Sequence, residues 1–252
     1  MEISLNGKVV LVTGASRGIG AAIAKACSDS GAKVALHYNS NQSQAEEVLR
    51  GLSCGSKAFQ ADLGSTESLI QLFEQVIDSF GCIDVLVNNA GIAISSDISS
   101  DNASWIRDWD TTFAVNTRAQ GLLCKLAIDH FIKRGGGRII NISSRAAFRG
   151  DTSEYLAYGA SKGAIVALTR SIARYYGKQN IAAFNIAPGF VRTDMAQDFM
   201  DQYGEDYALN DIALNKLTEP QDLAPMIVLL ASGLADHATG CTIDINAASY
   251  VH

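Results

Sequence analysis

The segment EYLAYGASKG (154–163) places a lysine four residues after a tyrosine. Four residues make about one helical turn, a rise of roughly 6 Å, so Tyr158 and Lys162 would share one helix face. Tyr155 has only Gly159 at the same spacing. A free tyrosine titrates at about pH 10, and a neighbouring ammonium group favours the phenolate, which should draw the pKa toward neutrality. We therefore expect Tyr158 to exchange a proton with a substrate, as an acid or as a base.

Two serines close the apolar segment RIINISS, at the point where a strand would end. A hydroxyl at that point can donate a hydrogen bond to a substrate oxygen and hold it near Tyr158. Ser144 and Ser143 are both candidates by position, although a serine in a loop most often bonds the local backbone. Together with a source of hydride, a serine and a tyrosine of this kind would reduce a ketone.

Three glycines, Gly14, Gly18 and Gly20, lie in TGASRGIG (13–20), between an expected strand and an expected helix. Glycine lets the backbone turn tightly and approach a ligand closely. The following helix would offer free N–H groups and the positive end of its dipole to a pyrophosphate. The spacing differs from the more familiar G-x-G-x-x-G, and a plain tight turn is the alternative. The flanking strand and helix favour a dinucleotide-binding loop.

Short apolar segments alternate with longer amphipathic ones along the chain. This pattern predicts a doubly wound, Rossmann-like α/β fold, in which helices cover both faces of a parallel sheet. Ligands of such folds bind at the carboxyl ends of the strands, where the groups described above fall. We expect a single domain over residues 1–252. The predicted strands are 8–14, 33–38, 57–62, 82–91 (running into a loop), 137–144, 181–189 and 241–246. The predicted helices are 17–31, 42–53, 65–80 (capped by Ser65), 104–134 (with a break near 110–112), 157–177 and 219–232.

The composition fits one large, ordered domain, with 252 residues of which 48 % are hydrophobic. The net charge of −6 and the lack of a basic stripe argue against a nucleic-acid partner. The five cysteines are scattered and the four histidines are isolated, so we expect reduced thiols and no bound metal. The sequence has no signal-peptide pattern and no run of about 18 apolar residues, so we expect a cytoplasmic protein that does not enter a membrane.

Five motifs in order resemble the short-chain dehydrogenase/reductase family over nearly the whole chain. They are TGASRGIG, NNAG at 88–91, Ser144, YGASK at 158–162 and PGFVRT at 188–193. The resemblance is strongest to members such as 3-oxoacyl-carrier-protein reductases and related carbonyl or sugar dehydrogenases. It implies that Tyr158 is the general acid in reduction and the general base in oxidation, that Ser144 positions the oxygen, and that Lys162 also binds the nicotinamide ribose.

The resemblance implies further site residues. Asn116, in FAVNTR, would anchor a water that relays protons to the lysine, although a solvated helix asparagine is the alternative. Asp62 and Leu63 would contact the adenine, and Thr193 and the backbone of Val191 would orient the nicotinamide. The complete set expected to bind the cofactor is Gly14, Ser16, Arg17, Gly18, Ile19, Gly20, Asn39, Ser40, Asp62, Leu63, Asn88, Asn89, Ala90, Gly91, Tyr158, Lys162, Pro188, Gly189, Val191 and Thr193.

The end of the second predicted strand bears on the choice of cofactor. NAD-specific folds often place an acidic residue there to bind the ribose hydroxyls, but this strand ends in HYNSN. The missing carboxylate, together with Arg17, favours NADP(H), with Asn39 and Ser40 as donors to the 2′-phosphate; NAD(H) remains possible. We therefore expect an NADP(H)-dependent reductase of a ketone or aldehyde. The alternatives are an NAD-linked alcohol or sugar dehydrogenase, a 3-oxoacyl-carrier-protein reductase and a non-catalytic dinucleotide-binding sensor.

The substrate is less clearly indicated. Basic residues that could dock a carrier protein are Lys133, Arg134, Arg145 and Arg149, yet Gln179 stands where a second docking arginine is expected. The acidic stretch 193–217 is long for a connection, so we expect a lid whose acids would repel an acidic carrier. These acids are Asp194, Asp198, Asp201, Glu205, Asp206 and Asp211. Phe184, followed by Asn185, stands where the family commonly has asparagine. Apolar faces on helices 104–134 and 157–177 resemble those that pair family members into a homo-tetramer.

Overall fold

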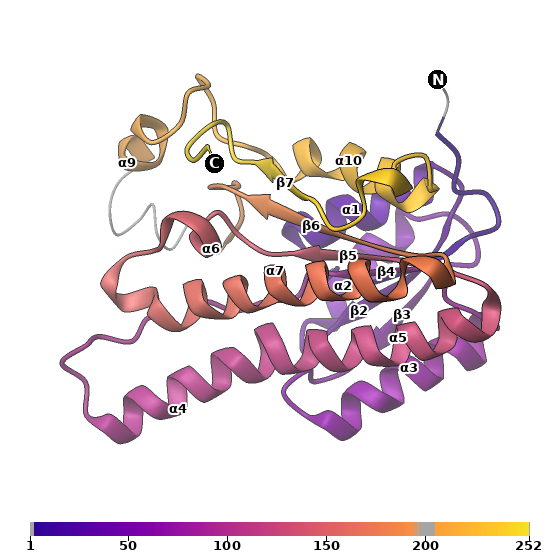
Figure 1. Cartoon of the computed structure of the whole chain (residues 1–252), viewed down its shortest axis with the longest axis horizontal. Coiled ribbons are helices and arrows are strands. Elements are labelled where there is room, and N and C mark those ends of the chain that lie inside the picture. The colour runs from indigo at the N-terminus through magenta and orange to yellow at the C-terminus, as the bar shows by residue number, and fades with distance from the viewer. Residues whose placement is uncertain (1–2, 195, 197–204, 252) are drawn as a thin grey trace.

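The computed structural model describes residues 3–194, 196 and 205–251, and its centre is a parallel sheet (Figure 1). The seven strands lie in the order β3-β2-β1-β4-β5-β6-β7, and every pair is parallel. The chain therefore winds outward from β1 in one direction and then, from β4, in the other, which confirms the predicted doubly wound α/β fold. The strands are β1 (Val9–Val12), β2 (Lys33–Tyr38), β3 (Lys57–Gln60), β4 (Val85–Asn88), β5 (Gly137–Ile142), β6 (Ile181–Pro188) and β7 (Thr242–Ile245).

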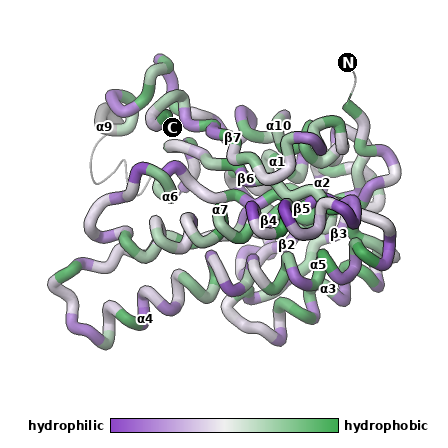
Figure 2. The backbone as a smooth tube through the Cα atoms, in the orientation of Figure 1, coloured by the Kyte–Doolittle hydropathy of each residue, from purple (hydrophilic) through white to green (hydrophobic). Residues whose placement is uncertain are grey.

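The central strands are apolar on both faces because helices cover both sides of the sheet. In β1, Val10 and Val12 belong to one buried cluster, whereas Leu11 belongs to the other. Successive side chains of a strand point to opposite faces, so a run such as VVLV supplies both layers of the core at once. In Figure 2 the hydrophobic segments gather along the sheet and the helix faces that meet it.

Three helices pack on each face of the sheet (Figure 1). On one face lie α1 (Gly18–Asp29), α2 (Gln42–Arg50) and α10 (Pro220–Ser232), and on the other lie α3 (Thr66–Phe80), α5 (Gln120–Arg134) and α7 (Leu156–Tyr176). Ser65 caps α3 as predicted, since its hydroxyl accepts the backbone N–H of Ser68 at 3.2 Å. These helices fix the ends of the strands, where the chemically suggestive residues lie.

The predicted helix 104–134 is interrupted at a different place and in a different way. α4 (Asn102–Phe113) and α5 are joined by a π-helix over Ala114–Ala119 rather than broken near 110–112. The buried side chain of Asn116 bonds the backbone of Ile92 and the hydroxyl of Ser161, and the wider turn accommodates these contacts. π-bulges of this kind often lie at functional sites.

Several short helices were not predicted, because segments of three to six residues are too short to show a helical period. They are α6 (Ala146–Arg149), α9 (Glu205–Asn210) and the 3₁₀ helices Ser153–Tyr155, Gly177–Gln179 and Asp236–Ala238. The first of these, α6, carries Arg149 and lies beside the cavity described below.

Among the described helices, none is long and apolar enough to cross a membrane. The five cysteines are free thiols.

Candidate active site

A cavity of about 490 Å³ opens at the carboxyl ends of the strands. Its walls come from the loops that follow β1, β4, β5 and β6 and from the start of α7, the place expected for a ligand in a doubly wound sheet. The predicted residues that line it are Ile19, Asn89, Gly91, Ser144, Tyr158, Lys162, Pro188, Gly189, Val191 and Thr193. Residues far apart in the sequence are thus brought to one pocket.

Tyr158, Lys162 and Ser144 meet at the base of this cavity. Tyr158 and Lys162 lie one turn apart on α7, and the Lys162 ammonium is 5.6 Å from the centre of the Tyr158 ring. Lys162 is almost completely buried, and its Nζ donates to the carbonyl of Ile142 at 3.0 Å. Ser144 interacts with the phenol of Tyr158 and acts to lower its pKa. Hydroxyl, phenol and ammonium groups are therefore within one site.

The two serines at the end of β5 have different surroundings. The hydroxyl of Ser143 turns away into the sheet, where it donates to the carbonyl of Ile186 at 3.0 Å and accepts from Asn185 at 2.8 Å. Both serines line the cavity, but Ser144 is the one that interacts with Tyr158, and its hydroxyl accepts the N–H of Ala146 at 3.1 Å. Phe184 is completely buried in the core. Ser144 is therefore the better placed serine for a ligand beside Tyr158, and Phe184 and Asn185 support the sheet.

The pKa of Tyr158 shifts in the direction opposite to the sequence-based prediction. Burial raises it to about 12, the hydrogen bond with Ser144 opposes this shift, and the charge of Asp151 adds to it. Burial also lowers the pKa of Lys162 to about 8. The expected fall in the tyrosine pKa is wrong for this structure because loss of hydration is the largest contribution. The phenol keeps its proton, which suits a proton donor.

Asn116 is held by protein groups on both sides of its amide. Its Oδ1 accepts the N–H of Ile92 at 2.9 Å, and its Nδ2 donates to the carbonyl of Ile92 at 2.8 Å and to Ser161 at 3.1 Å. A Cβ on Gly91 would lie 3.1 Å from the ammonium of Lys162 and 3.3 Å from Asn116 Oδ1. Asn116 therefore fixes the loop after β4 directly above the lysine.

The glycine loop packs closely against the loop that follows β4. A Cβ on Gly20 would lie 2.2 Å from the carbonyl oxygen of Gly14 and 2.6 Å from Nδ2 of Asn89, so only glycine fits. Asn89 donates to the carbonyls of Thr13 and Gly14 at 2.9 and 3.1 Å. The hydroxyl of Thr13 accepts the N–H groups of Asn89 and Ala90, both at 3.0 Å. Thr13 is a buried residue directly after β1, and its position in the sequence gives no signal for this role.

His37 is a second positioning residue that sequence reasoning missed. The N–H of Gly14 donates to His37 Nδ1 at 3.0 Å, so Nε2 carries the proton and donates to the carbonyl of Ala61 at 3.1 Å. Burial lowers the pKa of this imidazole to about 4, and the bond to Ala61 opposes the shift. The neutral ring thus joins the glycine loop to the end of β3. A lone histidine in a strand gives no sequence signal for this role.

The residues expected at the adenine and phosphate end lie around the carboxyl ends of β2 and β3. Arg17 precedes α1 and forms an exposed ion pair with Asp194, with 3.2 Å between the charged atoms. Asn39 and Ser40 are exposed after β2, and Leu63 is buried. Asp62 accepts the N–H of Gly64 at 2.8 Å, which closes a local turn. Ser16 is half-buried within the glycine loop.

Asn88 does not offer its side chain to the cavity. It is completely buried, and its Nδ2 donates to Asn141 at 2.9 Å and to the sulfur of Cys124 at 3.3 Å. It therefore joins β4 to β5 and α5, and a contact between Asn88 and a cofactor would involve its backbone. Its neighbours Asn89 and Gly91 do line the cavity.

The described residues that follow β6 form part of the cavity wall. Thr193 lies over the glycine loop, because a Cβ on Gly18 would be 3.3 Å from its methyl group. Val191 pairs with Thr218 as an isolated parallel bridge. Of the acids in the predicted lid, Asp194 and Asp211 form ion pairs. Asp198 and Asp201 lie outside the described residues, as do the side chains of Glu205 and Asp206.

The chain is similar to known proteins over nearly its whole length. A family model described as enoyl-(acyl carrier protein) reductase matches residues 14–247. Versicolorin reductase stcU of Emericella nidulans is 35 % identical, over 98 % of this chain and 97 % of its own length. The 3-oxoacyl-[acyl-carrier-protein] reductase FabG of Aquifex aeolicus is 32 % identical, over 98 % of each chain. A short-chain dehydrogenase from Burkholderia cenocepacia, solved with NADP, has a TM-score of 0.88 and 31 % identity, over 97 % of this chain and 98 % of that chain.

Proposed function

The chain belongs to the short-chain dehydrogenase/reductase family of NAD(P)-dependent oxidoreductases, which act on alcohol and carbonyl groups, and on that premise we propose that it reduces a ketone or aldehyde with NADP(H). The observation that carries this proposal is the meeting of Ser144, Tyr158 and Lys162 in one cavity. The reaction is reversible, so the same site would oxidise the alcohol.

The residues around the glycine loop fit a dinucleotide. Arg17 at the start of α1 makes no side-chain capping bond, so the first-turn N–H groups can bind a pyrophosphate. A side chain at Gly14 or Gly18 would meet Ala90 or Thr193 at 3.0–3.3 Å. Glycine at these positions avoids both contacts and lets a ligand approach the loop backbone closely. Gly14, Gly18, Gly20, Asn89 and Thr193 would hold this group.

The bound cofactor would supply the hydride, and the chain's own residues would supply the rest of the chemistry. The carbonyl oxygen of the substrate accepts a hydrogen bond from Ser144 and a proton from the phenol of Tyr158. The ammonium of Lys162 stabilises the phenolate that remains. Asn116 keeps the loop above Lys162 in place, and we retain the predicted proton relay beside it as part of the proposal.

NADP(H) is favoured over NAD(H) by the residues after β2. Asn39 and Ser40 are exposed there without a carboxylate that would repel a 2′-phosphate. Arg17 is also exposed, and its ion pair with Asp194 is of the weak surface kind, so it can turn toward an anion.

Cofactor choice and activity can be tested together. We expect NADPH to raise the melting temperature more than NADH does at equal concentration, because a ligand that binds only the native state stabilises it by mass action. NADPH oxidation should then follow the addition of ketones, aldehydes or β-keto thioesters from a panel. An equal or larger shift with NADH would favour the NAD-linked alcohol or sugar dehydrogenase. Cofactor binding without turnover of any compound would favour the sensor.

The pKa of Lys162 predicts a pH profile for the reduction. Below about pH 8 its amine is charged and stabilises the phenolate, whereas above that pH it loses its proton. We therefore expect kcat/KM for reduction to fall as pH rises through about 8. Lys162→Arg should move this fall to higher pH, since a guanidinium stays protonated. A flat profile from pH 7 to about 10 in the wild-type enzyme would contradict this assignment.

Two of the alternatives receive little support. The surface charges bear on the 3-oxoacyl-carrier-protein reductase, and the retained active-site residues bear on the sensor. Lys133 is paired with Asp129 at 2.7 Å, and Arg134 with Asp84 at 3.8 Å. Basic residues that are paired one-to-one are weaker docking points for an acidic carrier protein. Arg145 and Arg149 share the carboxylate of Asp211 and line the cavity, where they face a small ligand. We therefore favour a free small-molecule substrate. A retained serine, tyrosine and lysine set speaks against a sensor.

Further parts of the proposal concern the whole molecule. We propose a single domain with a substrate lid at about 193–217, supported by Thr193 and Ala196 in the cavity wall and by the ion pairs of Asp211.

We also propose a homo-tetramer, because Trp105, Trp109 and Phe113 stack along α4 and Ile106 beside them is 53 % exposed. Light scattering of a monomer at micromolar concentration would overturn the tetramer. The scattered free thiols support a cytoplasmic location.

A further inference from the structure

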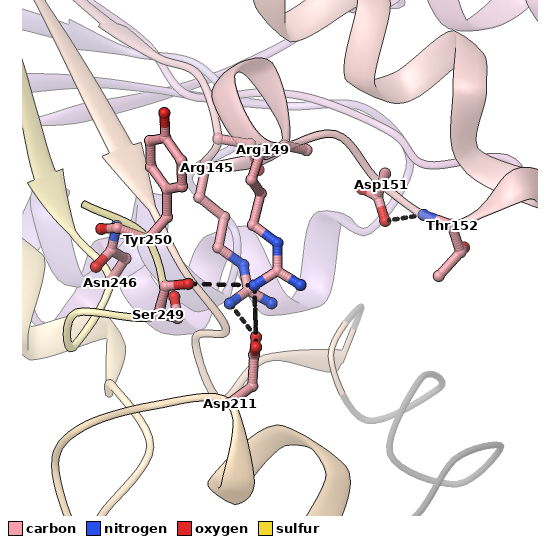
Figure 3. A network of polar contacts seen from close by, with 10 residues as sticks. Arg145, Arg149, Asp151, Thr152, Asp211, Asn246, Ser249 and Tyr250 are labelled. Atoms are coloured by element: carbon pink, nitrogen blue, oxygen red, sulfur yellow. Dashed lines mark hydrogen bonds and ion pairs between the residues drawn. The ribbon is translucent and has the colours of Figure 1, made fainter. Parts of the chain in front are cut away.

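Two arginine side chains converge on one carboxylate at the rim of the cavity. Arg145 precedes α6 and Arg149 ends it, and both point toward Asp211, which follows α9 (Figure 3). Nη1 of Arg149 lies 2.8 and 3.0 Å from the two carboxylate oxygens, and Nη1 of Arg145 donates to one of them. Nη1 of Arg149 also donates to the carbonyl of Ser249 at 3.2 Å. The structure therefore already shows this pair binding a carboxylate.

Most donors of the two guanidinium groups form no hydrogen bond with the part of the chain that the structure describes. A guanidinium carries five N–H donors, and within the described residues only those on Nη1 of each arginine form hydrogen bonds. Nε and Nη2 of Arg145 and Arg149 remain, and both residues line the cavity. Charged donors at a cavity wall, arranged in planar forks, fit an anion with two oxygens.

The charges of this group do not cancel. Two guanidinium groups share the single carboxylate of Asp211, which leaves one positive charge. Asp151 lines the same cavity, where its carboxylate accepts the N–H of Thr152 at 2.9 Å (Figure 3). Its charge acts on both arginines, although burial raises its pKa. At most one positive charge therefore remains, which suits a singly charged carboxylate better than a doubly charged phosphate.

The pair is also held in place before any ligand arrives. The side chain of Arg145 is only 10 % exposed, and its Cζ lies 4.4 Å from the centre of the Phe190 ring. The side chain of Arg149 is 32 % exposed, so it is the more accessible of the two. A prearranged pair of this kind binds an anion at a smaller cost in conformational entropy.

We propose, on the basis of the proposed function, that Arg149 and Arg145 bind a carboxylate of the substrate, which makes the preferred substrate a keto acid. Arg145 directly follows Ser144 and both line the cavity, so the bound carboxylate would share one cavity with the hydroxyl that positions the reacting carbonyl. Asp211 and Phe190 act as positioning residues for the two guanidinium groups. A carbonyl and a carboxylate in one molecule would thus be held at two fixed points.

Matched substrates test this inference. The kcat/KM for reduction should be measured for 4-oxopentanoate, 5-oxohexanoate and 6-oxoheptanoate and for their methyl esters. We expect at least one acid to exceed its ester by about tenfold or more, because a charge-assisted bond is lost in the ester. Arg149→Gln should bring this ratio close to one, mainly through KM, and Arg149→Lys should retain part of it. Arg50→Gln on the exposed end of α2 removes the same charge elsewhere and should keep the ratio.

A binding measurement separates this inference from the proposed function. Calorimetry with cyclohexanecarboxylate, which cannot be reduced, should give a dissociation constant that Arg149→Gln weakens about tenfold or more. Carboxylate binding that depends on Arg149, without reduction of any acid or ester, would support the subsite and contradict the reductase. Equal reduction of acids and esters, with carboxylate binding that ignores Arg149, would overturn the subsite and leave the reductase in place.

Discussion

Tyr158→Phe is expected to lower kcat for carbonyl reduction by roughly 10²–10⁴-fold, the range typical of a lost general acid. The substitution removes only the phenol hydroxyl of a residue that interacts with Ser144 in the cavity. The ring that packs beside the Lys162 ammonium remains, so the affinity for NADPH should change little. Steady-state kinetics and a fluorescence titration of NADPH would measure the two quantities on the same preparation.

Tyr155→Phe is the matched control, because Tyr155 also lines the cavity and lies in the 3₁₀ helix just before α7. It should retain turnover within a few-fold of the wild type. Loss of turnover in the Tyr155 variant and its survival in the Tyr158 variant would show that the proton comes from the other phenol. Unchanged melting temperatures would establish that both variants are folded.

The sheet could be predicted because its strands carry their own signal. Segments such as KVALHY are buried on both faces and end in turns, so their length and composition mark them, and β2 has the predicted bounds of 33–38. Tyr158 and Lys162 could be paired because helical spacing alone places them together. Features that depend on one element and its immediate neighbours in sequence could therefore be predicted.

Other parts of the site depend on contacts between distant segments. The π-helix at Ala114–Ala119 accommodates the bonds between Asn116 and Ile92, which are 24 residues apart in the chain. Asp211 meets Arg145 across 66 residues. Neither contact leaves a periodic pattern in the sequence. The residues could therefore be named from the sequence, but their partners could not be predicted. The same reason explains the wrong pKa direction for Tyr158, since burial is a property of the folded chain and is the largest contribution.

Gly20→Ala is expected to abolish detectable NADPH binding or weaken it by at least about tenfold, because the glycine loop must shift to admit a methyl group. The added Cβ would lie 2.2 Å from the carbonyl oxygen of Gly14, which is backbone and cannot turn aside as a side chain would. We also expect a loss of about 1–3 kcal/mol in the free energy of unfolding, as is usual for an overpacked site.

The matched control for this change is Gly51→Ala at the exposed end of α2. Gly51 has a φ of −87°, and its Cβ would make only an ordinary contact of 3.4 Å with the carbonyl of Val48. Alanine is allowed there, so cofactor binding and stability should stay close to those of the wild type. Calorimetric titration with NADPH and urea unfolding would measure both effects. If Gly20→Ala bound NADPH as tightly as Gly51→Ala does, the close packing of the glycine loop against Asn89 would not be what shapes the cofactor site, and the binding surface would have to lie elsewhere along the carboxyl ends of the strands.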